Sequence, residues 1–587
     1  MQQRGQAIEV CTTANDEGVV VKPQMSYASG ASEKPLLGMT IGDKLDETVS
    51  QFPDNEALVV KHQGIRLTYA QLQARVNQLA KSLIHLGLRK GDRIGVWSPN
   101  NYEWCATQFA TGKMGAILVN INPAYRSHEL EYVLRESGCV AIVISPEFKT
   151  SNYTEMLYEL CPELNNCQPG KLQSKRLPSL RTVIRLGKQA TPGMFTWDQV
   201  MEMANMVPDE ALTSRQGILQ FDDIINIQYT SGTTGFPKGA SLTHHNILNN
   251  GYFVADLQGI THKDRMCIPV PLYHCFGMVM GNLGCITHGA TMIYPAEGFD
   301  PLLTLQTVQE EKCTALYGVP TMFIAELDHP DFDTFDLSTL RTGIMAGSPC
   351  PIEVMRKVNT LMNMREVTIC YGMTETSPVS TQTRADTSLD KRVSTVGATH
   401  PHLEIKIINP ETGQVVPIGE PGELCARGYS VMAGYWNNEG ATRAAIDPAR
   451  WMHTGDLAEM DDEGYVKIVG RIKDMIIRGG ENIYPREIEE FLHLHPEISD
   501  VHVVGVPDVK YGEEIMVWIK RKPGSTSTLE EFRSFCKGKI AYYKIPRYVK
   551  FVDDFPMTVS GKIQKYLMRQ ESIKELGLEK AAETKTA

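Results

Sequence analysis

A glycine- and hydroxyl-rich segment between residues 229 and 239 carries the clearest chemical signal in the sequence. It reads Tyr-Thr-Ser-Gly-Thr-Thr-Gly-Phe-Pro-Lys-Gly. Apolar alternation at 225–229 predicts a strand before it, and Thr243 is placed to cap a helix after it. Glycines let backbone N–H groups approach an anion, hydroxyls add donors and a lysine adds positive charge, so we predict a phosphate-binding loop rather than an ordinary surface turn. Its predicted nucleotide-binding residues are Thr230, Ser231, Gly232, Thr233, Thr234, Gly235, Phe236, Pro237 and Lys238.

This segment is not a Walker A loop, because Lys238 follows a proline and precedes a glycine. It instead resembles the acyl-adenylate-forming superfamily of acyl-CoA synthetases, coumarate-CoA ligases, luciferases and peptide-synthetase adenylation domains. Segments at 371–376 (Tyr-Gly-Met-Thr-Glu-Thr), 451–456 (Trp-Met-His-Thr-Gly-Asp) and 560–563 (Ser-Gly-Lys-Ile) carry the same resemblance. The resemblance extends from about residue 40 to residue 570. It implies that the protein uses ATP to adenylate a carboxylic acid.

The segment at 371–376 follows a strand-like run, which places it at a strand's carboxyl end, where open α/β sheets bind ligands. The resemblance implies that Glu375, with Thr230, holds Mg²⁺ on the phosphates of ATP. A hard cation that bridges phosphates takes carboxylate and hydroxyl oxygens. A solvated surface glutamate is the alternative. The residues implied to lie beside the nucleotide here are Tyr371, Gly372 and Thr374.

Three charged residues nearer the C-terminus complete the implied set. The resemblance implies that Asp456 accepts hydrogen bonds from the ribose and that the donor fork of Arg471 closes on the same nucleotide. Lys562 is implied to contact the substrate carboxylate and the α-phosphate as pyrophosphate leaves. Taken singly, each could be an ordinary surface charge. The implied catalytic residues are Lys562, Glu375, Thr230 and Lys238.

Further positions are implied to contact the other two substrates. Gly480, in a glycine turn before a helix, is implied to let the pantetheine arm of coenzyme A pass close to the backbone. The implied acyl-pocket residues are His274, Gly318, Ala346 and Gly347, and the last three are small enough to leave room for a tail. His274 is interpreted either as a gate or as an ordinary core histidine.

Helix and strand patterns alternate along most of the chain. Thr68 and Gln71 form a capping box before an amphipathic helix, and a strand follows at 93–98. This repetition predicts layered α/β subdomains with parallel strands. Past residue 400, short alternating runs predict a β-rich subdomain, and after residue 470 the pattern predicts a compact α+β domain.

We therefore expect four segments along the chain. A flexible segment at 1–35 precedes a large nucleotide-binding domain at 36–472, and a small mobile domain at 473–570 precedes a flexible tail at 571–587. Lys562 and Gly480 are implied to serve one site at different steps. The small domain should therefore turn about a hinge at Lys473.

Composition limits the classes of protein that the chain can be. Its 587 residues are too many for one compact core, and 42% apolar with 22% charged residues is typical of an ordinary globular protein. The net charge of -11 argues against a nucleic-acid partner. We predict no transmembrane segment. The 13 cysteines lack zinc-site spacing and are interpreted as reduced thiols.

The sequence as a whole is identified as an ATP-, Mg²⁺- and coenzyme A-dependent acyl-CoA synthetase. Runs such as Asn-Pro-Ala-Tyr-Arg at 122–126 are similar to medium-chain fatty acid ligases assigned to mitochondria. The N-terminus is a poor match to an import presequence, which leaves a cytoplasmic location open. An aryl-CoA ligase or luciferase-like enzyme, and a non-catalytic lipid-binding scaffold, are the alternative functions. The sequence names no protein partner.

Overall fold

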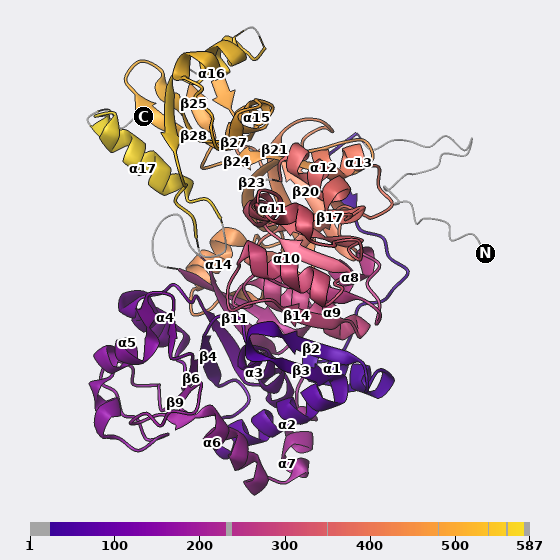
Figure 1. Ribbon diagram of the computed structural model, residues 1–587, viewed down its shortest axis with the longest axis vertical. Helices are drawn as coiled ribbons and strands as arrows, with labels where there is room; N and C mark the ends of the chain where they lie inside the picture. The colour runs from indigo at the N-terminus through magenta and orange to yellow at the C-terminus, as the bar shows by residue number, and fades with distance from the viewer. Residues whose placement is uncertain are drawn as a thin grey trace, which may run out of the picture.

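Two large sheets, a β-rich unit and a C-terminal α+β domain make up the protein (Figure 1). The computed structural model describes residues 24–230, 237–348, 350–478, 481–537, 539–558, 562–579 and 581. No helix in these ranges is long and apolar enough to cross a membrane. In Figure 1 the C-terminal domain lies at the top and the first large sheet at the bottom.

The first large sheet has eight strands and a parallel centre. β4 pairs in parallel with β5 and β6, β6 with β9, and β5 with β11, whereas β12 runs antiparallel to β11. In spatial order the strands are β10 (Phe195–Thr196), β9 (Thr182–Arg185), β6 (Ala141–Ile144), β4 (Arg93–Trp97), β5 (Ile117–Ile121), β11 (Ile224–Thr230), β12 (Lys238–Thr243) and β22 (Gly434–Tyr435).

The second large sheet has nine strands, and its inner strands from β2 to β17 are also parallel. The predicted parallel α/β architecture is therefore confirmed. In spatial order the strands are β19 (Ala398–Thr399), β18 (Val379–Gln382), β17 (Glu366–Gly372), β16 (Thr342–Ala346), β15 (Ala315–Gly318), β13 (Arg265–Cys267), β14 (Thr291–Tyr294), β2 (Glu56–Val60) and β3 (Ile65–Thr68).

Helices between the two sheets bury the main hydrophobic core. Val96 of β4, Leu58 of β2 and Leu248 of α8 belong to one continuous cluster. Burying such a side chain stabilises the fold by roughly 1.5 to 3 kcal/mol. The capping box of Thr68 and the cap by Thr243 form as predicted. The helices of this layer are α1 (Ile41–Gln51), α2 (Tyr69–His85), α3 (Tyr102–Met114), α8 (His244–Leu257), the π-helix η4 (Phe276–Leu283) and α9 (Gly284–His288).

The opposite face of each sheet is covered by its own helices, because successive strand side chains point to opposite faces. Trp97 belongs with α4 and α5 residues to a second cluster, and Met345 belongs with α10 and α12 residues to a third. These outer helices are α4 (Ser127–Ser137), α5 (Tyr153–Leu160), α10 (Pro301–Glu310), α11 (Pro320–Leu327) and α12 (Ile352–Leu361).

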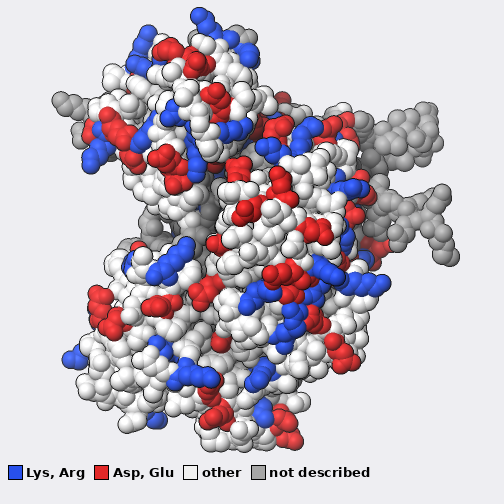
Figure 2. All heavy atoms as spheres, viewed as in Figure 1, with Lys and Arg blue, Asp and Glu red and all other residues white. Residues whose placement is uncertain are grey.

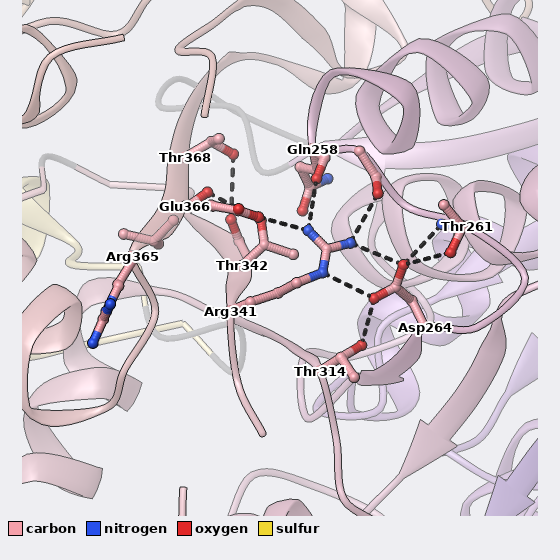
Figure 3. Close-up of polar contacts among 12 residues, drawn as sticks. Gln258, Thr261, Asp264, Thr314, Arg341, Thr342, Arg365, Glu366 and Thr368 are labelled. Atoms are coloured by element: carbon pink, nitrogen blue, oxygen red, sulfur yellow. Dashed lines mark hydrogen bonds and ion pairs between the residues drawn. The ribbon is translucent and has the colours of Figure 1, made fainter. Parts of the chain in front are cut away.

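Arg341 ties together the amino-terminal ends of strands in the second sheet (Figure 3). Its guanidinium donates to Asp264 at 2.9 and 3.2 Å and to Glu366 at 2.6 Å. Thr314, just before β15, also donates to Asp264 at 2.7 Å. Burial opposes ionisation of Asp264, but Arg341 and Thr314 hold its pKa below the ordinary value. The strands are thus fixed at the ends opposite the carboxyl ends, where the predicted site residues lie.

The predicted β-rich unit is a five-stranded sheet. Its strands in spatial order are β1 (Tyr27–Ser29), β20 (Leu403–Ile408), β21 (Gly422–Gly428), β23 (Met452–Met460) and β24 (Val466–Arg471). The first of these strands corrects the expectation that 1–35 is loose throughout. Three of its residues pair antiparallel with β20, and Ala28 is buried.

The C-terminal domain is a small sheet with helices, as predicted. Ile488 of α15 and Phe532 of α16 pack with Val503 and Val517 of the two long strands. Its elements are β25 (Ile476–Arg478), β26 (Glu481–Ile483), α15 (Pro485–Leu492), β27 (Ile498–Asp508), β28 (Gly512–Arg521), α16 (Leu529–Cys536), β29 (Tyr548–Val552) and α17 (Lys565–Glu575).

Helix α17 corrects the expected end of this domain at residue 570. The indole of Trp518 donates to the hydroxyl of buried Ser572 at 2.9 Å. Leu576 packs against the hydrophobic cluster that contains Trp518. A polar, Lys- and Glu-rich composition suggested a loose tail, but the serine and the leucine face the domain core. The first part of the expected tail is therefore folded.

A short turn joins the β-rich sheet to the C-terminal domain. β24 ends at Arg471, residues 472–474 turn, and β25 begins at Ile476 in a different sheet. Across this junction, Arg486 of α15 donates to the carbonyl of Ile468 on β24 at 2.9 Å. Lys473 lies within the turn.

Candidate functional site

The predicted site residues converge where the carboxyl ends of β15, β16 and β17 meet the β11–β12 hairpin and the β23–β24 pair. Thr230 ends β11 and Lys238 begins β12, so the glycine-rich loop is a hairpin connection. The helix predicted after this loop begins behind its cap at Thr243, but the strand β12 that precedes it, at residues 238–243, was not predicted. Residues 231–236 lie outside the described residues, as does Gly480.

Glu375 is held in a buried position directly after β17. It lies in the short 3-10 helix η6 (Thr374–Thr376) and is 5% exposed. The hydroxyl of Tyr435 donates to its Oε1 at 2.8 Å, and the hydroxyl of Thr230 lies 3.5 Å from the same oxygen. A carboxylate and a hydroxyl from two different sheets therefore face one another, which is a donor set suited to a hard cation.

Gly372 shapes the turn that carries Glu375. A Cβ at this position would lie 1.8 Å from the carbonyl oxygen of Pro378, so no other residue fits without backbone movement. The same carbonyl accepts from the N–H of Met373 at 2.9 Å. The glycine that was predicted for nucleotide contact therefore also has a packing reason to be there.

Tyr371, Asp456 and Arg471 form a hydrogen-bonded chain beside it. The phenol of Tyr371 donates to Asp456 Oδ2 at 2.7 Å, and Arg471 Nε donates to Oδ1 at 3.0 Å. Asp456 and Arg471 are direct cross-strand partners on β23 and β24. Burial and the neighbouring Asp456 carboxylate raise the pKa of Tyr371, so the phenol stays a donor. The chain fixes the Asp456 carboxylate between the two sheets.

Lys562 reaches this group from the C-terminal domain. Its backbone N–H donates to the hydroxyl of Thr558 at 3.0 Å. The residue is exposed by surface area, but its amino group lies among charged residues of the other two units. Partial desolvation of the amino group and the positive charge of Arg471 lower the pKa of Lys562 to about 8, against the opposing effect of Asp456 and Glu375. The ammonium is therefore poised to change charge near neutral pH.

His274 lies close to Lys562 on the other side of the site. Its Nδ1 accepts from the N–H of Phe276 at 3.2 Å, at the start of the π-helix η4. Burial, together with the positive charge of Lys562, lowers the pKa of His274 to about 4. The imidazole is therefore neutral at physiological pH, with its proton on Nε2 when Nδ1 accepts.

The small residues predicted for the acyl pocket end neighbouring strands. Gly318 is the last residue of β15 and Ala346 the last of β16, with Gly347 following. A Cβ on Gly318 would approach the ring of Phe323 to 2.9 Å, and Gly347 has φ +92°, which favours glycine. These positions share one edge of the sheet with Gly372.

Tyr435 is a site residue that sequence reasoning missed. It lies on the edge strand β22, donates to Glu375, and its ring centroid is 5.1 Å from the ammonium of Lys238. Burial and Glu375 raise the pKa of its phenol. An isolated aromatic residue in a turn-rich region gives no local signal, and only the pairing of β22 with β12 brings it here.

Charge on the molecular surface is mixed. Figure 2 shows Lys and Arg interspersed with Asp and Glu over the face in view.

Comparison with known proteins places these features in a family. The sequence model of the AMP-binding enzyme matches residues 45–436, and that of the AMP-binding enzyme C-terminal domain matches 487–562. The putative acyl-CoA synthetase YngI of Bacillus subtilis is 53% identical, over 92% of this chain and 99% of the relative. The mitochondrial medium-chain acyl-CoA ligase ACSF2 of Danio rerio is 49% identical, over 94% and 91%.

A solved structure gives the same result in three dimensions. The anthranilate CoA ligase AuaEII, crystallised with anthranoyl-AMP, superposes with a TM-score of 0.82 at 25% identity. The superposition covers 93% of this chain and 99% of the ligase.

Proposed function

This chain belongs to the AMP-binding enzyme family, and from that premise we propose that it is an ATP-dependent acyl-CoA synthetase acting on medium-chain fatty acids. The first half-reaction joins the acid to AMP and releases pyrophosphate. The second transfers the acyl group to coenzyme A and releases AMP. The relatives named as acyl-CoA synthetase and medium-chain ligase support both the reaction and the substrate class.

One observation carries the proposal. Lys562 of the C-terminal domain lies near Asp456 and Arg471 of the β-rich sheet and Glu375 of the nine-stranded sheet. Charges of both signs from separate units meet at strand ends, where α/β sheets bind ligands. This is the arrangement required to hold a nucleotide and a carboxylate together.

Each residue then has a role in the first half-reaction. Asp456 accepts hydrogen bonds from the ribose, and Arg471 both orients Asp456 and faces the nucleotide. Lys238 and the backbone of the glycine-rich loop bind phosphate oxygens. The carboxylate oxygen of the acid forms a bond to the α-phosphorus as the bond to the pyrophosphate oxygen breaks. The ammonium of Lys562 stabilises the negative charge that develops there.

Glu375 and Thr230 would hold the magnesium ion that accompanies ATP. Their oxygens lie 3.5 Å apart, and Tyr435 fixes the carboxylate by its hydrogen bond. When bound, the ion neutralises phosphate charge and favours departure of pyrophosphate. The protein supplies the oriented oxygens.

The second half-reaction requires the C-terminal domain to turn. Gly480 is proposed to line the coenzyme A path. In the sequence it follows β25, which the short turn that contains Lys473 joins to β24. A few loop residues can absorb a large backbone change in a hinge. Rotation there withdraws Lys562 and admits the thiol. The thiol sulfur then bonds to the acyl carbon, the bond to AMP breaks, and the thiol proton leaves to solvent.

We propose that His274 and the strand-end residues Gly318, Ala346 and Gly347 form the wall of the acyl pocket. A neutral imidazole beside small side chains favours an apolar tail. Thioester formation should therefore be measured for octanoate, palmitate, benzoate and coumarate under identical conditions. A maximum at octanoate supports the medium-chain assignment. A maximum at either aromatic acid would make the enzyme an aryl-CoA ligase, and no product from any acid would favour a non-catalytic scaffold.

The same likeness leads us to propose a mitochondrial location, as in the animal relatives, with the cytoplasm as the alternative. Fractionation of cells expressing the full chain and a chain without residues 1–23 distinguishes them. Loss of mitochondrial enrichment on truncation supports the proposal, and an unenriched full chain contradicts it.

A further inference from the structure

A cluster of three potential metal ligands lies in the β-rich sheet, near Asp456 of β23. Cys425 of β21 and His453 of β23 are direct cross-strand partners, and Glu423 lies two residues before the cysteine. His453 Nδ1 is 2.9 Å from Glu423 Oε2 and 3.6 Å from Cys425 Sγ. One ligand atom from each residue lies within 4.8 Å of the other two.

These separations can be compared with those around a tetrahedral zinc ion. Zn–S, Zn–N and Zn–O bonds of about 2.3, 2.0 and 2.1 Å at tetrahedral angles place N and S about 3.5 Å apart, and N and O about 3.4 Å apart. The N to S separation already matches. The N to O separation must widen by about 0.5 Å, which a rotation of the glutamate side chain supplies.

Polar neighbours flank Glu423 and His453. The other carboxylate oxygen of Glu423 accepts from the N–H of Gly455 at 3.1 Å. On the far side of the ring, His453 Nε2 faces Asp447 Oδ2 at 3.9 Å, where metal-bound histidines commonly have a carboxylate partner. Cys425 is fully buried, whereas the side chain of His453 is 31% exposed and offers a way in.

We propose that Glu423, Cys425 and His453 form a binding site for a thiophilic divalent cation such as Zn²⁺, distinct from the magnesium position at Glu375. A water molecule completes four ligands. A thiolate selects zinc over magnesium, because magnesium prefers oxygen ligands. Binding is an exchange: the thiol of Cys425 loses its proton to solvent and its sulfur bonds to the ion.

The site is placed to affect the nucleotide. Glu423 holds the N–H of Gly455, and Asp456 follows directly. An ion that draws Glu423 toward itself would therefore displace the part of β23 that contains Gly455 and Asp456. On the proposed function, occupancy should therefore alter the KM for ATP, whereas the binding measurement below does not depend on that function.

The test is a Zn²⁺ and Co²⁺ titration of the full, chelator-treated chain in excess Mg²⁺. Wild type should bind one equivalent of either metal ion tightly. Cys425→Ser and His453→Gln should not bind that equivalent, or should bind it at least about tenfold more weakly. Bound Co²⁺ should give a thiolate charge-transfer band that Cys425→Ser lacks. Cys167→Ser, which changes a partly exposed cysteine far along the chain, is the matched control and should bind as wild type does.

Two outcomes would overturn the site. One is the absence of any tight equivalent in folded wild type. The other is an equivalent retained by both cluster variants, which would place the ion elsewhere. Thermal unfolding of each apo variant establishes that it is folded. If Cys425→Ser does not fold, the His453→Gln titration decides alone, because glutamine keeps a donor toward Glu423.

Discussion

Replacing Lys562 by alanine should abolish the first half-reaction while sparing the second. The lysine approaches Glu375, Asp456 and Arg471 in the pose described here, and its ammonium is directed at charge that develops only when the adenylate forms. With acyl-AMP already made, that charge is no longer needed. The two half-reactions should therefore separate.

The size of the effect follows from two considerations. Loss of one preorganised donor in an active site costs at least about 10²-fold in rate. In addition, a pKa of about 8 means that the charged fraction of Lys562 falls from about nine tenths one unit below that pH to about one tenth one unit above it. Since the ammonium is the active form, wild-type adenylation should fall roughly tenfold as pH rises across this range.

The assay is pyrophosphate release in a single turnover with octanoate and ATP, followed over this pH range. With substrates well below saturation, the single-turnover rate is proportional to kcat/KM, which reports the free enzyme and should follow the pKa of the unliganded lysine. In parallel, synthetic octanoyl-AMP and coenzyme A are supplied, and thioester is measured. The alanine variant should show residual adenylation without the wild-type decline, and thioester formation near the wild-type rate.

The reasoning would be refuted if the variant lost both half-reactions equally while remaining folded, since the lysine would then not act in the first step alone. It would also be refuted if wild type and variant declined in parallel as pH rises. Another group would then control the rate.

Three further predictions test other parts of the account. Glu375→Gln keeps the acceptor for Tyr435 but removes the charge, so the apparent Mg²⁺ affinity should fall at least about tenfold; an unchanged magnesium titration would exclude this residue from the metal path. Lys473→Pro fixes φ near -65° and should freeze one pose of the C-terminal domain, so that pyrophosphate release in one turnover persists while thioester output collapses. Wild-type rates for both steps in the folded variant would contradict a hinge there. Arg341→Met leaves Asp264 buried without its ion pair and should lower the free energy of unfolding at neutral pH by about 2 kcal/mol. Because the pKa of Asp264 is lowered by folding, its stabilisation is present above the unfolded value and lost as pH falls through the folded value. The gap between Arg341→Met and wild type, followed by thermal unfolding, should therefore narrow below about pH 4, and a constant gap would contradict this.

The repeating architecture was predictable because its signals are local. The capping box at Thr68 and the alternation at Leu403 and Ile405 each depend on a few neighbouring residues. Strand β12 was missed because residues 238–243 have little apolar alternation. They form a strand through pairing with β11 and β22, and no pattern within the segment records that pairing.

The site was predictable in part for a different reason. Residues such as Asp456 and Glu375 stand in characteristic short segments, whereas Tyr435 reaches the site only through tertiary pairing. The position of Lys562 relative to Asp456 depends on how two domains meet, and sequence spacing cannot supply that. At Ser572 the sequence predicts a loose tail, because the residue is polar and its neighbours are charged. In the structure it is buried by its contact with Trp518.

The most direct test of the central claim is to identify the products of ATP. Enzyme, octanoate, Mg²⁺ and ATP without coenzyme A should yield octanoyl-AMP and pyrophosphate, about one equivalent per active site. Adding coenzyme A should then convert the adenylate to octanoyl-CoA and AMP. Formation of ADP and inorganic phosphate, or AMP production that does not require the acid, would contradict an acyl-CoA synthetase that works through an adenylate.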